Sequence, residues 1–350
     1  MLGVVVAGCS STETSQDDSH QSNGTSEAED EEESAEDNGD GDSEENGEAT
    51  TNNEGGTLRV AIESQPPTLD VVTTTALVTR DVTSQMFESL ITFNANHQPE
   101  PMLAESFETS EVGKTVTFKL REGVLFHNGK EMKAADVVAS MNRWLNWSSR
   151  AKAAFEAAEF KEVDDYTVVL ELDKPNRTTL SVLSSSVQLG AVMPKEVIEA
   201  AGDDEVTELI GTGPFKFEEW KQDQYIKLTK FDDYQSRTEP SDGPSGAREA
   251  LVDELYFMIV TDASTRVAGV QSGEYDISAA IPFDNYEQLK ADSNIQTYTA
   301  PDGFDILVFN KKEGILTDVK MRQAIAAALD MDAILKASYS NEAFYKLNPS

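Results

Sequence analysis

The first 55 residues divide the chain into two parts that differ in their capacity to fold. They hold 17 acidic residues and no Lys or Arg, and from Ser10 to Gly55 there is almost no apolar side chain. Such a segment cannot bury enough surface to offset the loss of chain entropy. We therefore predict a disordered acidic tether at residues 10–56. A folded core has to come from residues 57–350, which are enough for two domains.

The remaining part is also acidic. The chain has 64 Asp and Glu against 28 Lys and Arg, so residues 56–350 retain 47 acidic and 28 basic residues. This charge argues against a nucleic-acid partner and against attraction to an anionic membrane surface. An excess of carboxylates keeps a protein hydrated in concentrated salt and indicates a halophilic, salt-adapted source. The alternative is an ordinary acidic extracellular protein with an acidic tether.

Side chains that carry enzymatic or metal chemistry are scarce. The single cysteine excludes an internal disulfide framework, and His20, His97 and His127 are the only histidines. We find no nucleophile elbow, phosphate-binding loop, zinc-protease motif or dinucleotide fingerprint. We therefore predict no catalytic activity, no cofactor and no metal site. The Gly-rich stretch at Gly211–Pro214 ends in a proline and indicates a tight structural turn.

The start of the chain indicates a membrane anchor. An apolar run leads through Val6-Ala7-Gly8 to Cys9 and is followed at once by the polar segment. This pattern resembles a lipobox, the processing site of secreted lipoproteins, and implies that Cys9 carries a lipid. We predict a partial signal peptide and lipobox at residues 1–9, because only eight residues precede Cys9 and none of them is basic. Either the true start lies upstream of Met1 or the sequence is a fragment. The alternative is an unmodified cysteine.

Apolar spacing in the remaining part predicts a mixed α/β fold without an internal repeat. Residues repeating every three to four positions indicate helices, and alternating or continuous apolar runs indicate strands. Strands are predicted at 57–62, 115–120, 166–172 and 255–260, and helices at 76–90, 134–147, 319–329 and 333–337.

Several stretches, in the same order along the chain, resemble the family 5 extracellular solute-binding proteins, the dipeptide-, oligopeptide- and nickel-type binding components of ABC importers. The longest stretch is 86–144, which contains MFESLITFN and LREGVLFHNGKEMKAADVVASMNRW. The others are GGTLRVAIESQPPTLD before it, and GTGPFKFEEW, VDELYFMIVTDASTRVAGVQSGEYDI and FNKKEGILTDVKMRQAIAAALDMDAIL after it.

The resemblance implies a two-lobed, type II periplasmic-binding-protein fold that closes around a solute. The first lobe would occupy 57–298, and 299–350 would begin a second lobe that is incomplete, so that this chain alone would bind its solute weakly or not at all and would tend to aggregate. The implied partners are a solute, an ABC permease and its ATPase, at the extracellular face of the cell membrane. Peptides are the expected solute. A nickel chelate, an oligosaccharide, or a non-transport role as a surface sensor or structural lipoprotein remain alternatives.

The resemblance places two short segments where they could face the solute. Thr73, Thr74 and Thr75 precede the first predicted helix, and a helix N-cap cluster is their alternative role. Asp302, Phe304 and Asp305 lie where the chain would cross into the second lobe, and turn or hinge structure is their alternative. Asn146 and Asn176 begin N-glycosylation sequons, which also occur by chance.

Overall fold

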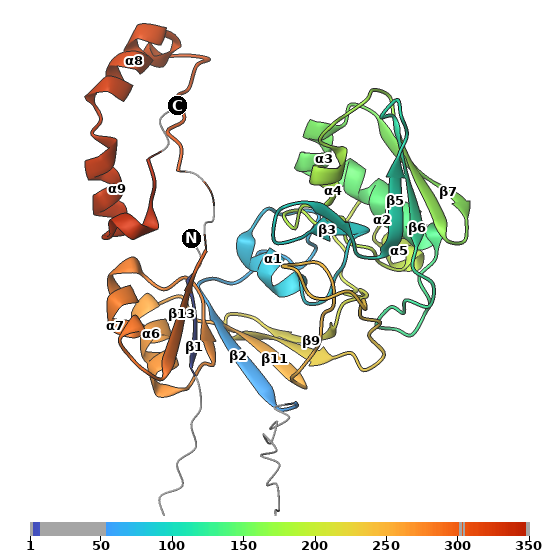
Figure 1. The fold of residues 1–350 in the computed structure, drawn as a ribbon, viewed down its shortest axis with the longest axis horizontal. Helices are drawn as coiled ribbons and strands as arrows, with labels where there is room; N and C mark the ends of the chain where they lie inside the picture. Colours follow the sequence, from blue (N-terminus) through green and yellow to red (C-terminus); the bar gives the residue numbers. More distant parts are fainter. Residues whose placement is uncertain (1–2, 8–53, 301–302, 304, 348–350) are drawn as a thin grey trace, which may run out of the picture. The chain divides into compact units, whose positions relative to one another are not determined.

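The structure is a computed structural model that describes residues 3–7, 54–300, 303 and 305–347 (Figure 1). Residues 10–53 of the predicted tether, Cys9, Asp302 and Phe304 therefore lie outside the described residues. The last three residues of the predicted tether are described, and Gly55 and Gly56 donate hydrogen bonds to the Leu251 carbonyl and to Asp253, at 2.7 and 2.9 Å, so the disorder predicted up to residue 56 is wrong at this end. Among the helices that are described, none combines the length and the apolar character that crossing a membrane requires.

The larger sheet places the first strand of the folded part at its centre. Within the described residues it has seven strands, in the order β13 (Ile295–Thr299), β1 (Gly3–Ala7), β12 (Ile277–Ser278), β2 (Thr57–Ile62), β11 (Glu254–Ile259), β10 (Tyr225–Lys230) and β9 (Phe215–Lys221). β2 runs parallel to both β11 and β12, and the other neighbours are antiparallel. The predicted strand at 57–62 is confirmed, and the one at 255–260 is confirmed to within one residue.

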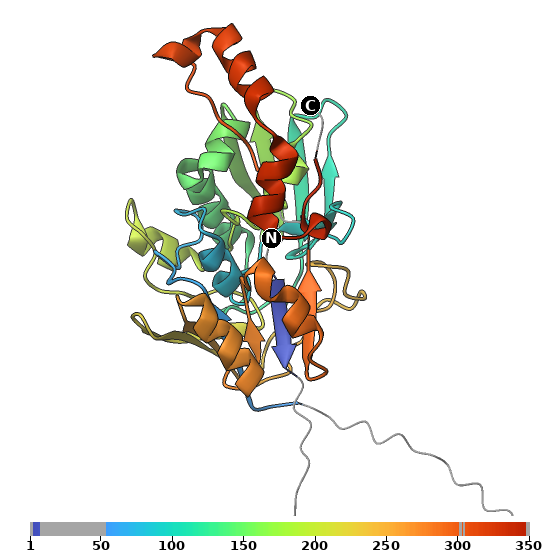
Figure 2. The same ribbon diagram turned by 90° about the vertical axis from the view of Figure 1, so that its left-hand side faces the viewer.

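Two helices lie against one end of this sheet. α6 (Ala263–Ser272) and α7 (Tyr286–Lys290) cover β1, β12 and β13, as both ribbon views show (Figures 1 and 2). A small core of Val267, Val270, Leu289 and Ile295 joins these helices to the sheet. β1 consists of residues that the sequence places in a signal peptide, and it pairs with both β12 and β13.

A second, four-stranded antiparallel sheet has the order β5 (Ala104–Thr109), β6 (Thr115–Leu120), β8 (Thr167–Leu172) and β7 (Ala158–Asp164) within the described chain. The alternating residues of β6 and β8 face the core, which confirms both predicted strands: Val116, Phe118, Leu120, Val168, Leu170 and Leu172 are buried. α2 (Ala134–Trp147), predicted with the same bounds, packs on β7 and β8. α3 (Ser149–Ala154) and α5 (Lys195–Ala201) pack on α2, and α4 (Thr179–Leu183) packs on α3.

The first predicted helix, at 76–90, is too long. α1 spans only Leu77–Thr83, and a loop then leads to the hairpin of β3 (Ile91–Phe93) and β4 (Pro99–Pro101). The carbonyls of Gln85 and Met86 accept hydrogen bonds from Phe215 and Gly213, so they are engaged by a distant segment. Met86 and Leu90 are nevertheless buried. The four-residue spacing of Met86 and Leu90 therefore reflects their burial and not a helix, because α1 ends before both residues.

The last described residues form a 3₁₀ turn at Ile315–Thr317, α8 (Val319–Ala328), α9 (Met331–Tyr339) and a 3₁₀ turn at Glu342–Phe344. The helix predicted at 319–329 is confirmed, and the one predicted at 333–337 lies inside α9. Asp330 caps α9 by accepting a hydrogen bond from the Ala333 amide, at 3.0 Å. Neither helix buries a residue among the described ones. The predicted boundary between 298 and 299 falls within β13 and remains a prediction.

Candidate functional site

A pocket of about 310 Å³ opens beside the end of α1. Its lining comes from α1, the loop that follows it and Thr92 of β3, from the loop that contains Met102, from the 186–189 loop and from the 244–248 loop. Arg80, Glu88 and Arg248 supply the charged groups of the lining, and Phe87, Met102 and Leu189 supply apolar surface. Segments more than 150 residues apart in the sequence therefore meet at this pocket.

A buried carboxylate stands at the centre of the polar contacts. The Glu88 side chain is only 1% exposed, and Arg248 Nη1 lies 3.5 Å from its Oε1. Thr212 donates to Oε2 and Tyr234 donates to Oε1, each at 2.8 Å. Burial, and then the charge of Glu88, raise the pKa of the Tyr234 phenol, so the phenol keeps its proton and remains a donor. The buried negative charge is therefore satisfied from three directions.

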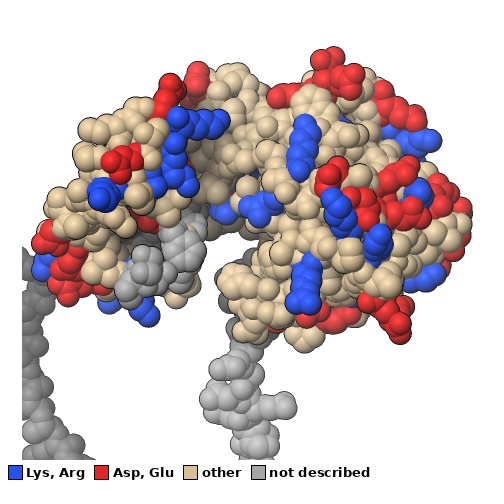
Figure 3. All heavy atoms as spheres, turned by 90° about the horizontal axis from the view of Figure 1, so that it is seen from above, with Lys and Arg blue, Asp and Glu red and all other residues tan. Residues whose placement is uncertain are grey.

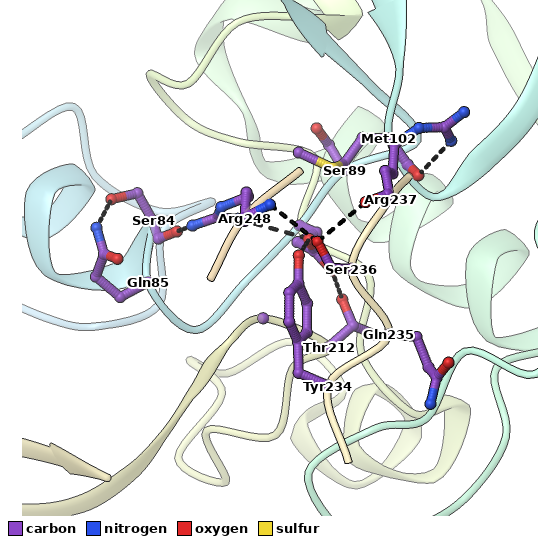
Figure 4. Close-up of polar contacts among 12 residues, drawn as sticks. Ser84, Gln85, Ser89, Met102, Thr212, Tyr234, Gln235, Ser236, Arg237 and Arg248 are labelled. Atoms are coloured by element: carbon purple, nitrogen blue, oxygen red, sulfur yellow. Dashed lines mark hydrogen bonds and ion pairs between the residues drawn. The ribbon is translucent and has the colours of Figure 1, made fainter. Parts of the chain in front are cut away.

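Arg248 ties its loop to the end of α1. Its Nη2 donates to the carbonyl of Ser84 at 2.6 Å, and its backbone amide donates to the Ser236 hydroxyl at 2.9 Å (Figure 4). Ser84 is the C-cap of α1, where a carbonyl lacks a helical partner and a cation is favourable. Arg248 therefore fixes the wall of the pocket against the helix.

Two further arginines hold the neighbouring loop. Arg237 Nη1 donates to the carbonyls of Met102 and Ala104, at 3.1 and 3.0 Å (Figure 4). Arg121 Nη2 donates to the carbonyls of Gln235 and Ser236, at 2.5 and 3.1 Å. Arg121 thus binds carbonyls of the loop, and Arg237, which belongs to the loop, binds carbonyls at the start of β5. These contacts hold the loop that carries Tyr234 against β5.

The Gly-rich turn is packed directly on the segment that follows α1. A Cβ atom on Gly211 would lie 2.1 Å from the Met86 carbonyl oxygen, and one on Gly213 would lie 2.6 Å from that of Gln85. Only glycine allows so close an approach. The turn therefore has the structural role that the sequence indicates, and it carries Thr212 to Glu88.

His127 clamps this turn through both ring nitrogens. Its Nδ1 accepts from the Gly211 amide at 3.2 Å, so we infer that its Nε2 carries the proton and donates to the Gly213 carbonyl at 3.0 Å. Burial disfavours the charged ring and lowers its pKa from 6.5 to about 4. The clamp therefore depends on a neutral imidazole.

We expect this histidine to make stability depend on pH. The unfolded chain takes up a proton at His127 near pH 6.5, whereas the folded protein does so only near pH 4. Stability is therefore full above pH 6.5 and falls as the pH decreases towards 4, by up to about 3 kcal/mol from this group. Urea unfolding at pH 7 and pH 4 should show a steeper fall for the parent than for His127→Gln, because the acidic residues titrate in both proteins. Equal falls would contradict the assignment.

The predicted threonines lie in the turn before α1. The Thr73 hydroxyl and amide both donate to the Asp70 carbonyl, at 3.0 and 3.1 Å. The Thr74 hydroxyl accepts from the Ala76 amide at 3.1 Å, and Thr75 is exposed. The N-cap of α1 is Ala76, without a side-chain cap, so the alternative role as N-cap residues is wrong. None of the three lines the pocket, and their contact with solute remains a prediction.

The other predicted residues are separate from the pocket or undescribed. Asp305 is exposed and accepts a hydrogen bond from the Tyr339 hydroxyl, while Asp302, Phe304 and Cys9 lie outside the described residues. Asn146 is exposed, but the hydroxyl of its sequon partner Ser148 is buried and caps α3.

The side chain of Asn176 is engaged within the protein. Its Nδ2 donates to the Ala154 carbonyl at 2.8 Å, and its Oδ1 accepts from the amide and hydroxyl of Thr178, at 2.9 and 2.7 Å. A glycan on this nitrogen would have to break the first contact. Glycosylation of either asparagine remains a prediction.

Sequence reasoning missed the pocket and its charged residues. Glu88 and its partners Thr212, Tyr234 and Arg248 are 124 to 160 positions apart, and no local spacing connects them. The available signal was the Gly-Thr-Gly turn, whose two glycines require a close neighbour. Among the described residues there is no group of three or more His, Cys, Asp or Glu that could hold a metal ion.

Solved structures share this arrangement of strands and helices. The oligopeptide-binding protein AppA from Bacillus subtilis, in complex with a nonapeptide, aligns with a TM-score of 0.66 and 26% identity, over 81% of this chain and 55% of that chain. DppA from Helicobacter pylori, in complex with the peptide STSA, aligns with a TM-score of 0.68 and 23% identity, over 83% and 59%. The fold is therefore that of the type II periplasmic binding proteins, which confirms the predicted class.

The sequence assigns the chain more narrowly. Residues 98–348 match the model described as "Bacterial extracellular solute-binding proteins, family 5 Middle". A probable peptide ABC transporter periplasmic-binding protein of Sinorhizobium fredii is 30% identical over 83% of this chain and 55% of its own length. The dipeptide-binding protein of Escherichia coli is 35% identical over 68% and 47%. The chain therefore belongs to family 5 of the extracellular solute-binding proteins, and it spans about half the length of these relatives.

Proposed function

We propose that this chain captures peptides outside the cell for an ABC importer. The observation that carries the proposal is membership of family 5 together with two peptide-named relatives at 30% and 35% identity. The AppA structure adds a peptide-bound relative at 26% identity. Other relatives are named for glutathione or heme, so the solute class has to be tested directly.

In this proposal the protein binds its solute without transforming it and passes it to a permease that an ATPase drives. Closure of the two lobes is favoured only to the extent that the solute binds the closed form more tightly. The threonines of 73–75 and the aspartates at 302 and 305, with Phe304, are the proposed solute contacts. A lipid on Cys9 would hold the protein near the permease and raise its effective concentration there.

The surface charge supports a salt-adapted setting. Residues 56–350 carry 47 acidic and 28 basic residues. In the view of Figure 3, acidic side chains gather in groups toward the edges of the visible face, and basic side chains lie between these groups and nearer its middle. Concentrated salt would screen the repulsion between these carboxylates.

The test is binding of defined solutes to the full 350-residue chain. We expect weak, saturable chemical-shift changes in NMR titrations with dipeptides and tetrapeptides. We expect no such changes with nickel–histidine or with a neutral oligosaccharide. Mass spectrometry of solutes that co-purify should identify peptides. Saturable binding of the metal chelate or the sugar, without any peptide binding, would contradict the proposal.

A further inference from the structure

The pocket beside α1 has unused hydrogen-bond donors on its arginines. Within the part of the chain that the structure describes, Arg248 Nε has no partner, and Nη1 is 3.5 Å from Glu88. A charge-assisted hydrogen bond is normally 2.7–2.9 Å long, so the contact with Glu88 leaves Nη1 incompletely engaged. The oxygens of Glu88 already accept from Thr212 and Tyr234. Of this charged pair, Arg248 therefore keeps hydrogen-bond donors for a ligand, whereas the oxygens of Glu88 are already occupied.

Arg80 adds a second guanidinium to the lining. Its Nε and Nη2 both donate to Asp81 Oδ1, at 2.9 and 2.7 Å, which leaves its Nη1 available. Arg80 is paired with Asp81, and Arg248 lies against Glu88, so the two arginines and their carboxylates carry no net charge together. Both guanidinium groups nevertheless keep N–H groups without a partner among the described residues. A carboxylate can accept hydrogen bonds from such N–H groups, whereas a cation cannot.

The rest of the lining is apolar and therefore favours a ligand with an apolar part. Phe87, Met102, Leu189 and Pro244 supply it. The volume of about 310 Å³ is at the lower end of the range for small-molecule pockets, and it suits a group of the size of one amino-acid residue. An anionic head on a short apolar tail matches both parts of the lining.

We propose that this pocket binds a carboxylate carried on a short apolar tail, with Arg248 as the residue that anchors the carboxylate. Glu88, held by Thr212 and Tyr234, keeps the guanidinium in place, and the Ser84 carbonyl fixes its other edge. The inference deepens the proposed function, because the C-terminal residue of a peptide has this chemistry. A free short-chain carboxylic acid has it too.

The test compares an acid with its own amide. We would titrate the full chain with 4-methylpentanoate and with 4-methylpentanamide, which differ at the head group alone, and follow binding by NMR. We expect the acid to bind about 10-fold more tightly than the amide, as one charge-assisted hydrogen-bonded pair allows. Arg248→Gln should abolish this preference, and Arg248→Lys, which keeps the charge but loses the planar fork, should retain part of it.

Arg237→Gln is the matched control. Arg237 holds the neighbouring loop through backbone carbonyls but does not line the pocket. This variant should keep the 10-fold preference even if it unfolds at a lower temperature. Equal binding of acid and amide by the parent would overturn the proposal. A preference that persists in Arg248→Gln would overturn the assignment to this arginine.

A second pair of probes separates the two sources of the carboxylate. Ala-Leu and Ala-Leu amide differ in the same way at the peptide C-terminus. A preference for the free-acid peptide that Arg248→Gln removes would assign the pocket to peptides. A preference confined to 4-methylpentanoate would assign it to free carboxylic acids. If no peptide binds while the acid preference remains, the pocket assignment stands and the proposed peptide capture fails.

Discussion

Asp70→Ala is expected to lower the free energy of unfolding by about 3–5 kcal/mol, because it leaves a buried cation without its partner. Asp70 is 0% exposed, and Arg143 is 4% exposed. Their side chains are joined by two contacts, Oδ2 to Nη2 at 2.6 Å and Oδ1 to Nη1 at 3.2 Å. The Val206 amide also donates to Asp70 Oδ2, at 2.9 Å. The substitution therefore removes the charge and a backbone hydrogen bond together.

Asp81→Ala provides the matched control. Asp81 also pairs with an arginine at 2.7 Å, but both side chains are about one-quarter exposed. Pairs open to solvent contribute about 0–1 kcal/mol, so urea unfolding should show a loss in this range. The double variant Asp70→Ala/Arg143→Met should recover part of the loss, because it removes the stranded charge. Similar losses for both aspartate variants would show that burial of the first pair has no such effect.

This ion pair shows what the sequence could and could not predict. The Pro-Thr-Leu-Asp turn is recognisable as a local pattern, but its partner lies 73 positions further along, inside α2. The periodicity of α2 predicts an apolar face, and Arg143 lies next to Trp144 on a helix whose buried residues include both. A charged residue at such a position reads as solvent-facing. Only the packed structure shows that it is buried with a carboxylate.

Some helices and strands can likewise be predicted from local spacing, whereas others depend on distant contacts. β6, β8 and α2 bury one regular face each, so their bounds follow from spacing alone. β9 and β10 have a bulge between Lys227 and Leu228, and β9 mixes charged residues with Phe215, Phe217 and Trp220. The resemblance covers these strands, but alternation alone does not mark them. α1 ends at Thr83, and beyond it the amides of Gly213 and Phe215 bind the carbonyls of Met86 and Gln85, a long-range contact that local spacing does not show.

The candidate site also combines residues that the sequence could predict with residues that only the structure brings together. Thr73–Thr75 come from resemblance to a family, and the structure places them in a turn without bringing them to the pocket. The pocket depends on four loops and on contacts that span more than 100 positions. Its most informative residues are a buried glutamate and a half-buried arginine, which are ordinary in a chain with 92 charged residues.

Cys9→Ser is expected to move the protein from the membrane fraction to the medium when the gene is expressed in a host that processes lipoproteins. This expectation rests on the sequence Val6-Ala7-Gly8-Cys9, which is followed by a polar segment without Lys or Arg. Serine keeps the size of the side chain but lacks the thiol that the lipid alkylates. Because stable anchoring needs two acyl chains or an equivalent pair of signals, the loss of this single attachment point should release nearly all of the protein. Fractionation and immunoblotting measure this, with Ser10→Ala as the matched control that should stay with the membrane.

The predicted processing also has a consequence for β1. Cleavage before Cys9 would remove Gly3–Ala7, the strand that pairs with both β12 and β13. The backbone groups of these two strands would then lose their partner. Hydrogen exchange at 277–278 and 295–299 should therefore be faster in the processed protein than in the 350-residue chain purified from the cytoplasm without export, whose intact mass should include residues 1–8. Retention of Cys9→Ser at the membrane, or a parent protein whose mass shows an unmodified Cys9, would contradict lipid anchoring.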